Sequence, residues 1–460
     1  MRFSIVGAAL LAALAGCVSV QPPQAVSSHP KNILFFLGDG MGINTLTAAR
    51  IYAVGEDGDL TLDTLPESAF VKTFSNDAQT TDSAASMSAY MTGIKSNNGA
   101  ISMSTDTPAR EGCTGGRAAP SLAELARRRG MAVGVVTTTR VTDATPAAVY
   151  AHACHRSKEA DIASALVPGG AGYNSALGGL DVLLGGGTDA FLPLAQGGKR
   201  ADGRDLLAEL RTRGYRSVAD SAQLNAVDAA SGAPLVGLFA PENLSYDAVR
   251  NPARDPGLAA MASKAISVLS KKPNGFFLVV EGGLIDLALH DTHAKRALQE
   301  VVSFDNTLKA TIAQMQAIDP GLKNTLIVVT ADHDHTLLLN GYARRTGKTT
   351  PTEPGVLGLV RRVDNGKVRV DVDGAPFTII GFGTGESRVQ GKRAAAPLLT
   401  DAIVTADDYH QQAVVRTAAG DETHGGSDVF LGAIGAGADA FHGAIDNTRV
   451  FELIKAAGGW

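Results

Sequence analysis

Short apolar runs alternate with stretches of helical pattern through most of the 460-residue chain. An apolar run of about five or six residues has the length of a strand buried on both faces, whereas apolar positions spaced three and four apart indicate a helix. We expect strands at 33–37, 132–137, 235–239, 276–280, 325–330 and 429–434. We expect helices at 46–54, 84–92, 121–129, 204–213, 255–270, 292–318 and 448–456. This alternation predicts an α/β fold with a central, mostly parallel sheet and helices on both of its faces.

The helix predicted at 255–270 has the clearest start signal, because Asp255 is placed to cap it and Pro256 to occupy its first position. The alternation of strands and helices stops between 337 and 420. That stretch is rich in loops and contains an alternating segment, 367–372, which predicts a local strand. We therefore divide the chain into an α/β core at 32–336, an inserted subdomain at 337–420 and a C-terminal return to the core at 421–460.

The N-terminus has the pattern of an export signal. The apolar run from 3 to 15 is too short for a comfortable membrane span, and residues 1–16 are expected to be a signal peptide. Leu14-Ala15-Gly16-Cys17 resembles the lipobox of bacterial lipoproteins, and an ordinary cleavable signal peptide is the alternative. Residues 17–31 would form a flexible tether. We therefore expect an exported protein, either periplasmic or anchored to the outer membrane by a lipid at Cys17.

Composition narrows the class of protein further. A hydrophobic fraction of 45% with 19% charged residues is typical of a globular chain. The formal net charge of −5 argues against a nucleic-acid partner, because such proteins usually present a basic face. Besides Cys17 the chain has Cys113 and Cys154. In an oxidising compartment these two form one disulfide or remain two free thiols, and the sequence leaves both outcomes open.

A serine at the start of a predicted helix is the first candidate for chemistry. Ser83 follows Asp82 and precedes the small residues of the helix at 84–92. The N-terminus of a helix offers free N–H groups and the positive end of the helix dipole, so an anion is stabilised beside it. Taken alone, an Asp-Ser pair before an alanine-rich run is ordinary helix capping.

Acidic residues and a histidine end or follow three of the predicted strands. In order along the chain they are Asp39, Glu281, Asp332 and His333. Sites in open α/β sheets lie at the carboxyl ends of the strands, so we expect these side chains to converge. So many carboxylates at one edge would repel each other unless cations lie among them.

Three further residues suit the same edge. Asp286 and His290 lie just beyond Glu281 and are four positions apart, the spacing of one helix face. His424 precedes the last predicted strand. Aspartate and histidine together are the ligands expected for zinc or a similar divalent ion.

Six stretches resemble the motifs of alkaline phosphatases, in that family's order and over nearly the whole chain from 32 to 456. They are Gly38-Asp39-Gly40-Met41-Gly42, Thr81-Asp82-Ser83-Ala84-Ala85, Asp143-Ala144-Thr145-Pro146-Ala147-Ala148, Val280-Glu281-Gly282-Gly283-Leu284-Ile285-Asp286, Thr330-Ala331-Asp332-His333 and Thr423-His424-Gly425-Gly426. The extended form that begins at Glu422, together with the long insertion, resembles the animal branch of the family. The resemblance implies the fold of that family, a crown-like insertion and a homodimer joined through it.

The resemblance also implies a role for each matched residue. Ser83 would be the nucleophile, Arg156 would hold the phosphate, and Asp143 would lie beside the bound substrate. The ligands of the first of two zinc ions would be Asp286, His290 and His424. Those of the second would be Asp39, Asp332 and His333, next to Ser83. A single magnesium ion would be held by Asp39, Thr145 and Glu281.

The implied reaction is the hydrolysis of small phosphate monoesters through a phosphoserine. A serine hydroxyl is a poor nucleophile unless a metal or a base takes up its proton. Two metal ions about 4 Å apart stabilise both the attacking and the leaving oxygen of an in-line displacement. The planar guanidinium of Arg156 matches two phosphate oxygens, which lysine does not.

Two positions depart from the patterns of the family. The well-known bacterial enzyme pairs an aspartate at the position of Asp143 with a lysine where this chain has Leu287, and animal enzymes have histidine at both. Because leucine neither holds phosphate through water nor ligates a metal, we expect weaker binding of product phosphate and an unsettled third metal site. His293 and His335 lie near the motifs and are given no role, and His442 is placed at the mouth of the site or in a purely structural setting.

Two other functions fit part of this pattern. A phosphodiesterase or a sulfatase-like enzyme would use the same scaffold, but Arg156 and three metal sites favour monoesters. A lipid-anchored protein that binds phosphate or metal without turnover would not need Ser83. The sequence therefore favours a metal-dependent phosphomonoesterase.

Overall fold

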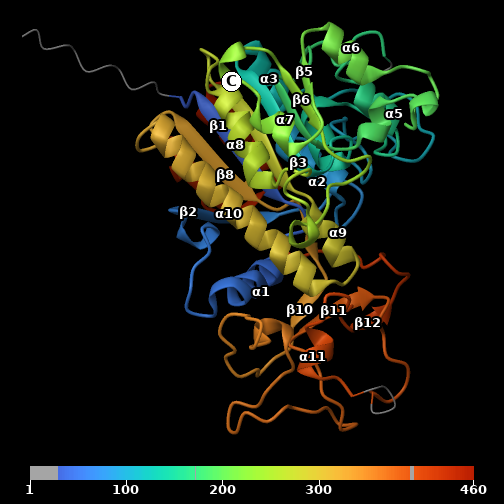
Figure 1. Ribbon diagram of the computed structural model, residues 1–460, viewed down its shortest axis with the longest axis vertical. Helices are drawn as coiled ribbons and strands as arrows, with labels where there is room; N and C mark the ends of the chain where they lie inside the picture. Colours follow the sequence, from blue (N-terminus) through green and yellow to red (C-terminus); the bar gives the residue numbers. More distant parts are fainter. Residues whose placement is uncertain (1–28, 171, 394–397) are drawn as a thin grey trace, which may run out of the picture.

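The structure is a computed structural model that describes residues 29–170, 172–393 and 398–460 (Figure 1). The predicted signal peptide at 1–16, Cys17 and the tether as far as residue 28 lie outside the described residues. Among the described residues, no helix combines the length and the apolar character needed to cross a membrane.

A central sheet of ten strands organises the described chain (Figure 1). In their order across the sheet the strands are β15 (Gly443–Asp446), β2 (Glu67–Lys72), β14 (Val429–Gly435), β8 (Thr325–Thr330), β1 (Asn32–Gly38), β7 (Phe276–Gly282), β3 (Ala132–Arg140), β4 (Val182–Gly186), β6 (Leu235–Leu238) and β5 (Arg216–Val218). Only β14 runs antiparallel to its neighbours within this sheet; the other adjacent pairs are parallel. The predicted α/β fold with a mostly parallel sheet is confirmed.

The order and register of the strands in the middle of the sheet determine where the acidic residues at the ends of these strands lie. β1 is apolar and buried from Ile33 onward, as expected for a strand covered on both faces. It lies between β7 and β8, and Leu37 is opposite Glu281 on one side and Thr330 on the other. The three strands therefore end level with one another, and the residues that follow them share one edge.

Helices cover both faces of the sheet. The α-helices of the described chain are α1 (Ile43–Val54), α2 (Ser83–Thr92), α3 (Leu122–Arg128), α4 (Ala144–Tyr150), α5 (Glu159–Ser164), α6 (Leu206–Thr212), α7 (Ser221–Asn225), α8 (Leu258–Leu269), α9 (Leu284–His290), α10 (Ala294–Ile318), α11 (Asp401–Val404) and α12 (Asn447–Gly458), of which α11 lies away from this sheet. α10 packs on α1, α8 and α9, and it crosses the front of the sheet in Figure 1. α2 packs on α3, α4 and α12. α8 and α3 both pack on β3 and β7 but not on each other, so the two groups of helices lie on opposite faces of the sheet.

The start of α8 differs from the prediction. The helix begins at Leu258 with Gly257 as its N-cap, so the predicted cap at Asp255 is wrong. The carboxylate of Asp255 pairs with Arg254 Nε at 3.3 Å instead, and its backbone carbonyl accepts a hydrogen bond from Arg250. Pro256 and Gly257 separate Asp255 from the helix, so Pro256 does not occupy the first helical position either.

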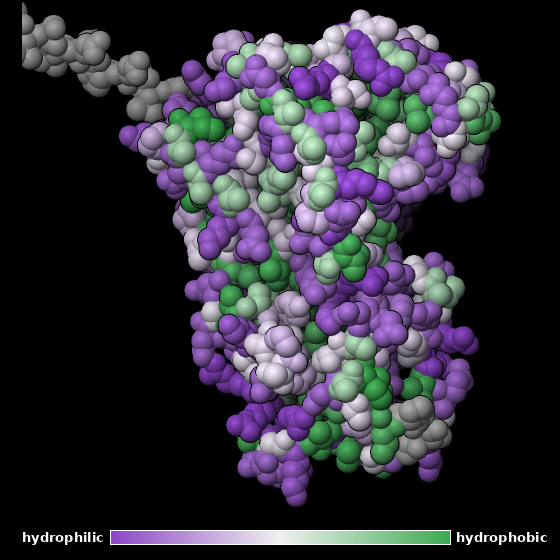
Figure 2. Space-filling view, in the orientation of Figure 1, coloured by the Kyte–Doolittle hydropathy of each residue, from purple (hydrophilic) through white to green (hydrophobic). Residues whose placement is uncertain are grey.

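A smaller lobe lies below the main sheet in Figure 1. It contains a three-stranded sheet of β10 (Leu337–Leu339), β11 (Ile380–Gly385) and β12 (Ala413–Arg416), together with α11. Large apolar side chains are exposed on it, and some appear as green patches at the bottom of Figure 2. They are Tyr342, Val363, Val370, Val372, Leu398, Ile403, Val414 and Val415. The assignment of 337–420 as one inserted unit stays a prediction.

The strand predicted at 367–372 is wrong. That segment forms only isolated bridges, which join Val368 to Arg361 and Val370 to Pro376. Val370 and Val372 are exposed, so the alternation of apolar and charged residues has no core to face. Alternation stabilises a strand only when one of its faces is buried.

Candidate active site

Asp286, His290 and His424 form the first group of candidate ligands. Asp286 and His290 lie on α9, and His424 begins β13 (His424–Gly425), which pairs with β9 (Asp334–His335). His290 Nε2 lies 3.3 Å from Asp286 Oδ1 and 3.2 Å from His424 Nε2, and His424 Nε2 lies 3.6 Å from Asp286 Oδ1. Ligand atoms about 2.0–2.1 Å from a tetrahedral zinc ion are roughly 3.3 Å apart, so the spacing of this group fits zinc.

A second group surrounds His333 and includes the candidate nucleophile. His333 Nε2 lies 3.4 Å from Asp39 Oδ1, 3.4 Å from Asp332 Oδ2 and 3.3 Å from Ser83 Oγ. Asp39 Oδ1 and Asp332 Oδ2 are both buried without a hydrogen-bond partner. Four donor atoms thus converge on one point, and the two orphaned oxygens lack the positive partner that buried carboxylates require.

A third group consists of oxygen donors alone. Thr145 Oγ1 donates to Asp39 Oδ2 at 3.2 Å, which is the other oxygen of the carboxylate that serves the second group. Glu281 Oε2 accepts hydrogen bonds from Thr137 and Thr139, and Glu281 Oε1 is buried without a partner. Magnesium prefers oxygen ligands, so this set suits magnesium better than zinc.

Burial makes the carboxyl groups of this edge hard to ionise in the absence of a cation. It raises the pKa of Glu281 to about 8 and that of Asp332 to about 7. Burial and the neighbouring carboxylates, first among them Asp332, also raise the pKa of Asp39 well above its ordinary value. Burial lowers the pKa of His333 to about 3, so this ring is neutral at physiological pH and free to ligate. A neutral imidazole among orphaned carboxylates is a site suited to divalent cations.

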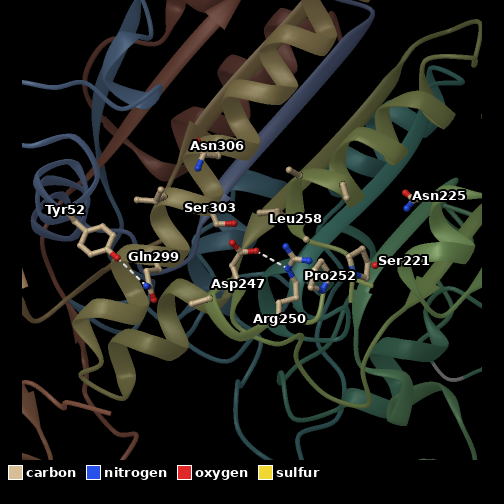
Figure 3. Close-up of a pocket in the computed structure, with 16 residues that line it drawn as sticks. Tyr52, Ser221, Asn225, Asp247, Arg250, Pro252, Leu258, Gln299, Ser303 and Asn306 are labelled. Atoms are coloured by element: carbon tan, nitrogen blue, oxygen red, sulfur yellow. Dashed lines mark hydrogen bonds and ion pairs between the residues drawn. The ribbon is translucent and has the colours of Figure 1, made fainter. Parts of the chain in front are cut away.

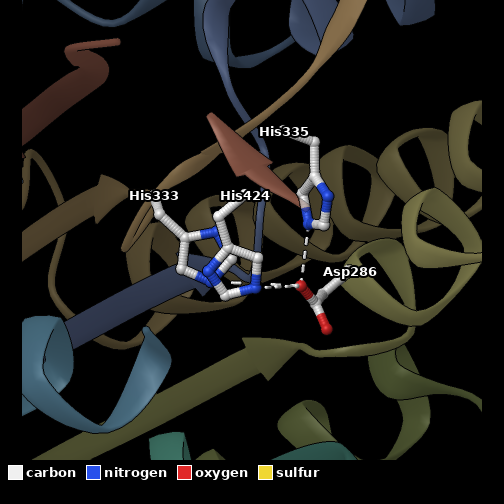
Figure 4. Close-up of side chains that lie close together, drawn as sticks. All are labelled: Asp286, His333, His335 and His424. Carbon is white, nitrogen blue, oxygen red and sulfur yellow. Dashed lines mark hydrogen bonds and ion pairs between the residues drawn. The ribbon is translucent and has the colours of Figure 1, made fainter. Parts of the chain in front are cut away.

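His335 and Glu422 are part of the site, although the sequence alone assigns them no role. His335 Nε2 lies 2.8 Å from Asp286 Oδ1 (Figure 4), and its Nδ1 hydrogen-bonds to the Glu422 carboxylate. Burial would lower the pKa of His335, but Glu422 and Asp286 outweigh it and raise that pKa to about 10. Burial would raise the pKa of Asp286, but His290 and His335 hold it well below its ordinary value.

The spacing of the histidines contained a signal for His335. It lies two residues after His333, and side chains two apart in an extended segment point to the same side. In Figure 4, His335 and the stacked pair of His333 and His424 approach the Asp286 carboxylate from two directions. The ligand atoms of these four residues lie within 4.8 Å of one another. Asp286 is therefore the carboxylate that the histidine cluster shares.

Ser83 begins α2 and is held rigidly against the second group. Asp82 caps the helix by accepting a hydrogen bond from Ala85 N. Ser86 Oγ donates to Asp332 O at 2.7 Å, and Tyr90 OH donates to Ala331 O at 2.8 Å. The helix that carries the hydroxyl is thus bonded directly to the loop that carries Asp332.

Arg156 lies in a turn between α4 and α5. Its Nη1 is 3.3 Å from Asp82 Oδ2, and its Nη2 is 2.8 Å from Asp143 Oδ1. Asp143 also pairs with Arg140 at 2.9 Å. Burial would raise the pKa of Asp143, but Arg156 and Arg140 outweigh it and keep that pKa below its ordinary value. Arg156 is therefore held beside Ser83 by Asp82, the residue that precedes Ser83 in the sequence.

Leu287, His293 and His442 lie outside the three groups of candidate ligands. Leu287 is partly exposed on α9, between the two candidate ligands of that helix. His293 precedes α10 and is buried, and burial lowers its pKa to about 4. His442 is exposed, and its Nδ1 hydrogen-bonds to Asp439 O at 2.9 Å. No metal-binding group found among the described residues includes any of these three side chains.

The sequence left Cys113 and Cys154 either joined in a disulfide or as two free thiols. Cys113 and Cys154 form a disulfide, with their Cα atoms 6.2 Å apart, so the alternative of two free thiols is excluded.

A cavity of about 650 Å³ lies beside α8 and α10 (Figure 3). Its lining includes Arg250, which is already paired with Asp247 at 3.0 Å, and none of the candidate ligands.

Comparisons with known proteins agree with this geometry. The family model described as alkaline phosphatase matches residues 30–460. The tissue-nonspecific alkaline phosphatase isozyme of Rattus norvegicus is 37% identical over 467 residues, which cover 93% of this chain and 83% of the relative. An alkaline phosphatase of Gadus morhua is 34% identical, over 91% of this chain and 90% of the relative.

Solved structures of similar fold have the same description. The alkaline phosphatase of Thermus thermophilus superposes with a TM-score of 0.67 at 25% identity, over 94% of this chain and 92% of that one. A variant of the TAB5 alkaline phosphatase, with Mg bound in its M3 site, superposes with a TM-score of 0.65 at 25% identity, over 94% and 99% of the two chains.

Proposed function

The chain belongs to the alkaline phosphatase family, whose members hydrolyse phosphate monoesters, and we propose that it does so through a phosphoserine formed at Ser83. The observation that supports this role most directly is the position of Ser83 Oγ, 3.3 Å from His333 Nε2. The same nitrogen faces the orphaned oxygens of Asp39 and Asp332. A hydroxyl among metal-ligating atoms is a nucleophile that a cation can activate.

We assign two zinc ions and one magnesium ion to the three groups of ligands. Asp286, His290 and His424 would hold the first zinc ion. Asp39, Asp332 and His333 would hold the second, beside Ser83. Asp39, Thr145 and Glu281 would hold magnesium, an assignment supported by the oxygen-only donors of that group. Cations bound in these groups would lower the pKa of the serine hydroxyl and of water and would neutralise charge on the phosphate.

The residues of the chain then perform a two-step substitution. Ser83 Oγ attacks phosphorus, the bond from phosphorus to the ester oxygen breaks, and the alcohol leaves. Water attacks the phosphoserine in the second step, releasing inorganic phosphate and restoring the hydroxyl of Ser83. Arg156 holds two non-bridging oxygens with the guanidinium donors that Asp82 and Asp143 leave free. Asp143 acts on the substrate by orienting Arg156.

The quaternary and cellular assignments are also proposals. Exposed apolar side chains on the smaller lobe support a homodimer joined there as a crown, because contiguous apolar patches on a surface often mark interfaces. Export, with a lipid anchor at Cys17 if the lipobox is used, rests on the N-terminal sequence.

One experiment tests the reaction and its cofactors together. Hydrolysis of a chromogenic phosphomonoester and of its diester analogue is measured at alkaline pH, before and after chelation, with zinc and magnesium added back. We expect monoester turnover that chelation abolishes and both metals together restore. Diester preference would instead indicate a phosphodiesterase, and tight metal binding without turnover would indicate a binding protein.

The nucleophile is tested by Ser83→Ala, with Ser267→Ala on the surface of α8 as the control. Ser83→Ala should lose turnover and keep its zinc content, because the other ligands remain. Among the described residues, the hydroxyl of Ser267 bonds only to its own helix and to Gln314, so its loss should leave activity unchanged. Full activity in Ser83→Ala would refute the phosphoserine mechanism.

A further inference from the structure

The turn that carries Arg156 has no regular secondary structure, so its position depends on its attachments. It connects α4 to α5, and the proposed function requires its arginine to face Ser83. Ala153 forms a bridge with Ile101, with hydrogen bonds of 2.9 and 3.0 Å in the two directions. Arg156 N donates to Gly99 O at 2.7 Å. The backbone of the turn is thus bonded to the segment that follows α2.

That segment is also bonded to the N-terminus of the nucleophile helix. Gly99 N donates to Asp82 Oδ2 at 3.0 Å, and Asp82 N donates to Asn98 Oδ1 at 3.1 Å. Gly99 has a φ of +87°, and a Cβ there would lie 2.7 Å from the ring of His155, so the side chain of His155 packs directly against this glycine. A shift of the turn would therefore change where Arg156 lies relative to Ser83.

Two side chains of the turn reach into the interior. His152 bonds to Ser102 O at 2.8 Å and to Glu124 at 2.6 Å, which fixes the start of the turn to α3. Cys154 is buried two residues before Arg156 and forms the disulfide with Cys113. The side chain of Cys154 is the last buried attachment before the arginine.

The other half of the disulfide lies in an exposed loop. Between residues 108 and 118, Cys113 is the one buried residue. The disulfide therefore joins a solvated loop to the phosphate-binding turn, and two roles are open to it. It either tethers the loop alone, or it also holds the turn in the geometry that Arg156 needs.

We propose that the Cys113–Cys154 disulfide is a positioning element for Arg156 and so for binding of phosphate and phosphate monoesters. This inference rests on the proposed role of Arg156. The covalent bond restrains the backbone two residues before the arginine, while Asp82 and Asp143 restrain its guanidinium. Without the disulfide, the guanidinium pairs remain but the turn that carries them is held only by hydrogen bonds.

The test is a double-mutant cycle between the disulfide and the arginine. Cys113→Ala and Cys154→Ala are made separately in the wild-type and in the Arg156→Ala backgrounds. For each purified, zinc- and magnesium-loaded enzyme, kcat and KM for a chromogenic monoester and the inhibition constant of inorganic phosphate are measured. Zinc content and circular dichroism verify that each variant is folded.

With Arg156 present, loss of either cysteine should raise KM and the phosphate inhibition constant together, by roughly threefold to tenfold, because a charge-assisted hydrogen bond is weakened but not removed. In the Arg156→Ala background the same substitution should change neither constant. Equal effects from the two cysteines would show that the bond matters, and Cys113→Ala tests this from the exposed side if Cys154→Ala fails to fold.

Three results would overturn the inference. Unchanged constants after loss of the disulfide would mean that it only tethers the loop. An effect that persists in the Arg156→Ala background would mean that it acts through general stability. If Arg156→Ala itself left phosphate inhibition unchanged, the proposed role of the arginine would fail as well, which separates that failure from the first two.

Discussion

Removing the metal ions should make the stability of this protein fall as pH rises above neutrality, and Glu281 should account for much of the fall. Its side chain is almost fully buried, with Oε1 unpartnered, and burial raises its pKa in the metal-free protein to about 8 from an ordinary value of 4.5. Between these two values the native state holds a proton that the unfolded state has lost. The free energy of unfolding therefore decreases with pH through this window.

The magnitude follows from the two pKa values. Between about pH 6.5 and about pH 8.0, Glu281 alone should lower the free energy of unfolding by about 1.6 kcal/mol. Asp332 and His335 act in the same direction, because their pKa values are also raised. The lowered pKa of His333 acts in the opposite direction but contributes only about 0.4 kcal/mol, because the unfolded-state imidazole, with a pKa of 6.5, is half protonated at the lower pH.

The assay is thermal unfolding of the chelated protein at these two pH values. An unfolding entropy of about 2.1 cal/mol/K per residue converts the Glu281 contribution into a fall in midpoint of about 2 °C. The metal-free variant Glu281→Gln, which keeps the size of the side chain but cannot ionise, should fall by about 2 °C less than the wild type. Adding zinc and magnesium should restore the wild type more at the higher pH. Identical slopes for wild type and Glu281→Gln, or a midpoint that rises with pH, would refute the reasoning.

Two further predictions concern single side chains beside the proposed metals. Leu287→Lys should lower the inhibition constant of inorganic phosphate, because it adds a cation at a partly exposed position of α9. The control Leu287→Met should leave this constant unchanged. Equal inhibition constants for the two variants would refute this idea. His335→Ala should weaken zinc binding by about 10–100-fold, as loss of a supporting hydrogen bond to a ligand does, measured by competition with a chromogenic chelator. Unchanged zinc affinity would mean that His335 does not orient Asp286.

The strands that build the site could be predicted because they are buried on both faces. β1, β7 and β8 are nearly continuous apolar runs, and such runs are recognisable without any knowledge of their neighbours. β2 was missed because it is half exposed and contains charged residues at both ends. β4 was missed because it is short and ends in two glycines, which are poor strand formers.

The composition of the site was harder to predict than its location. The acidic residues at the strand ends indicated an edge of the sheet. The distances between these residues depend on β1 lying between β7 and β8, and this strand order cannot be predicted from any local sequence pattern. His335 and Glu422 are 87 positions apart, and their hydrogen bond exists only because β13 pairs with β9. Local sequence patterns therefore predicted individual residues, whereas the support of one ligand by another required the tertiary structure.

That same pairing explains how the smaller lobe can lie in sequence between two parts of the candidate metal site. The chain leaves the site at His335, forms the smaller lobe and returns at Glu422, where the two residues hydrogen-bond to each other. Glu422 O also accepts a hydrogen bond from His290 Nδ1 at 2.5 Å, so the returning segment fixes a candidate zinc ligand of α9. The two segments that lead into and out of the smaller lobe are thus held together at the site itself. Closing a longer loop between fixed ends costs little additional entropy, so the lobe can differ in length without moving the ligands.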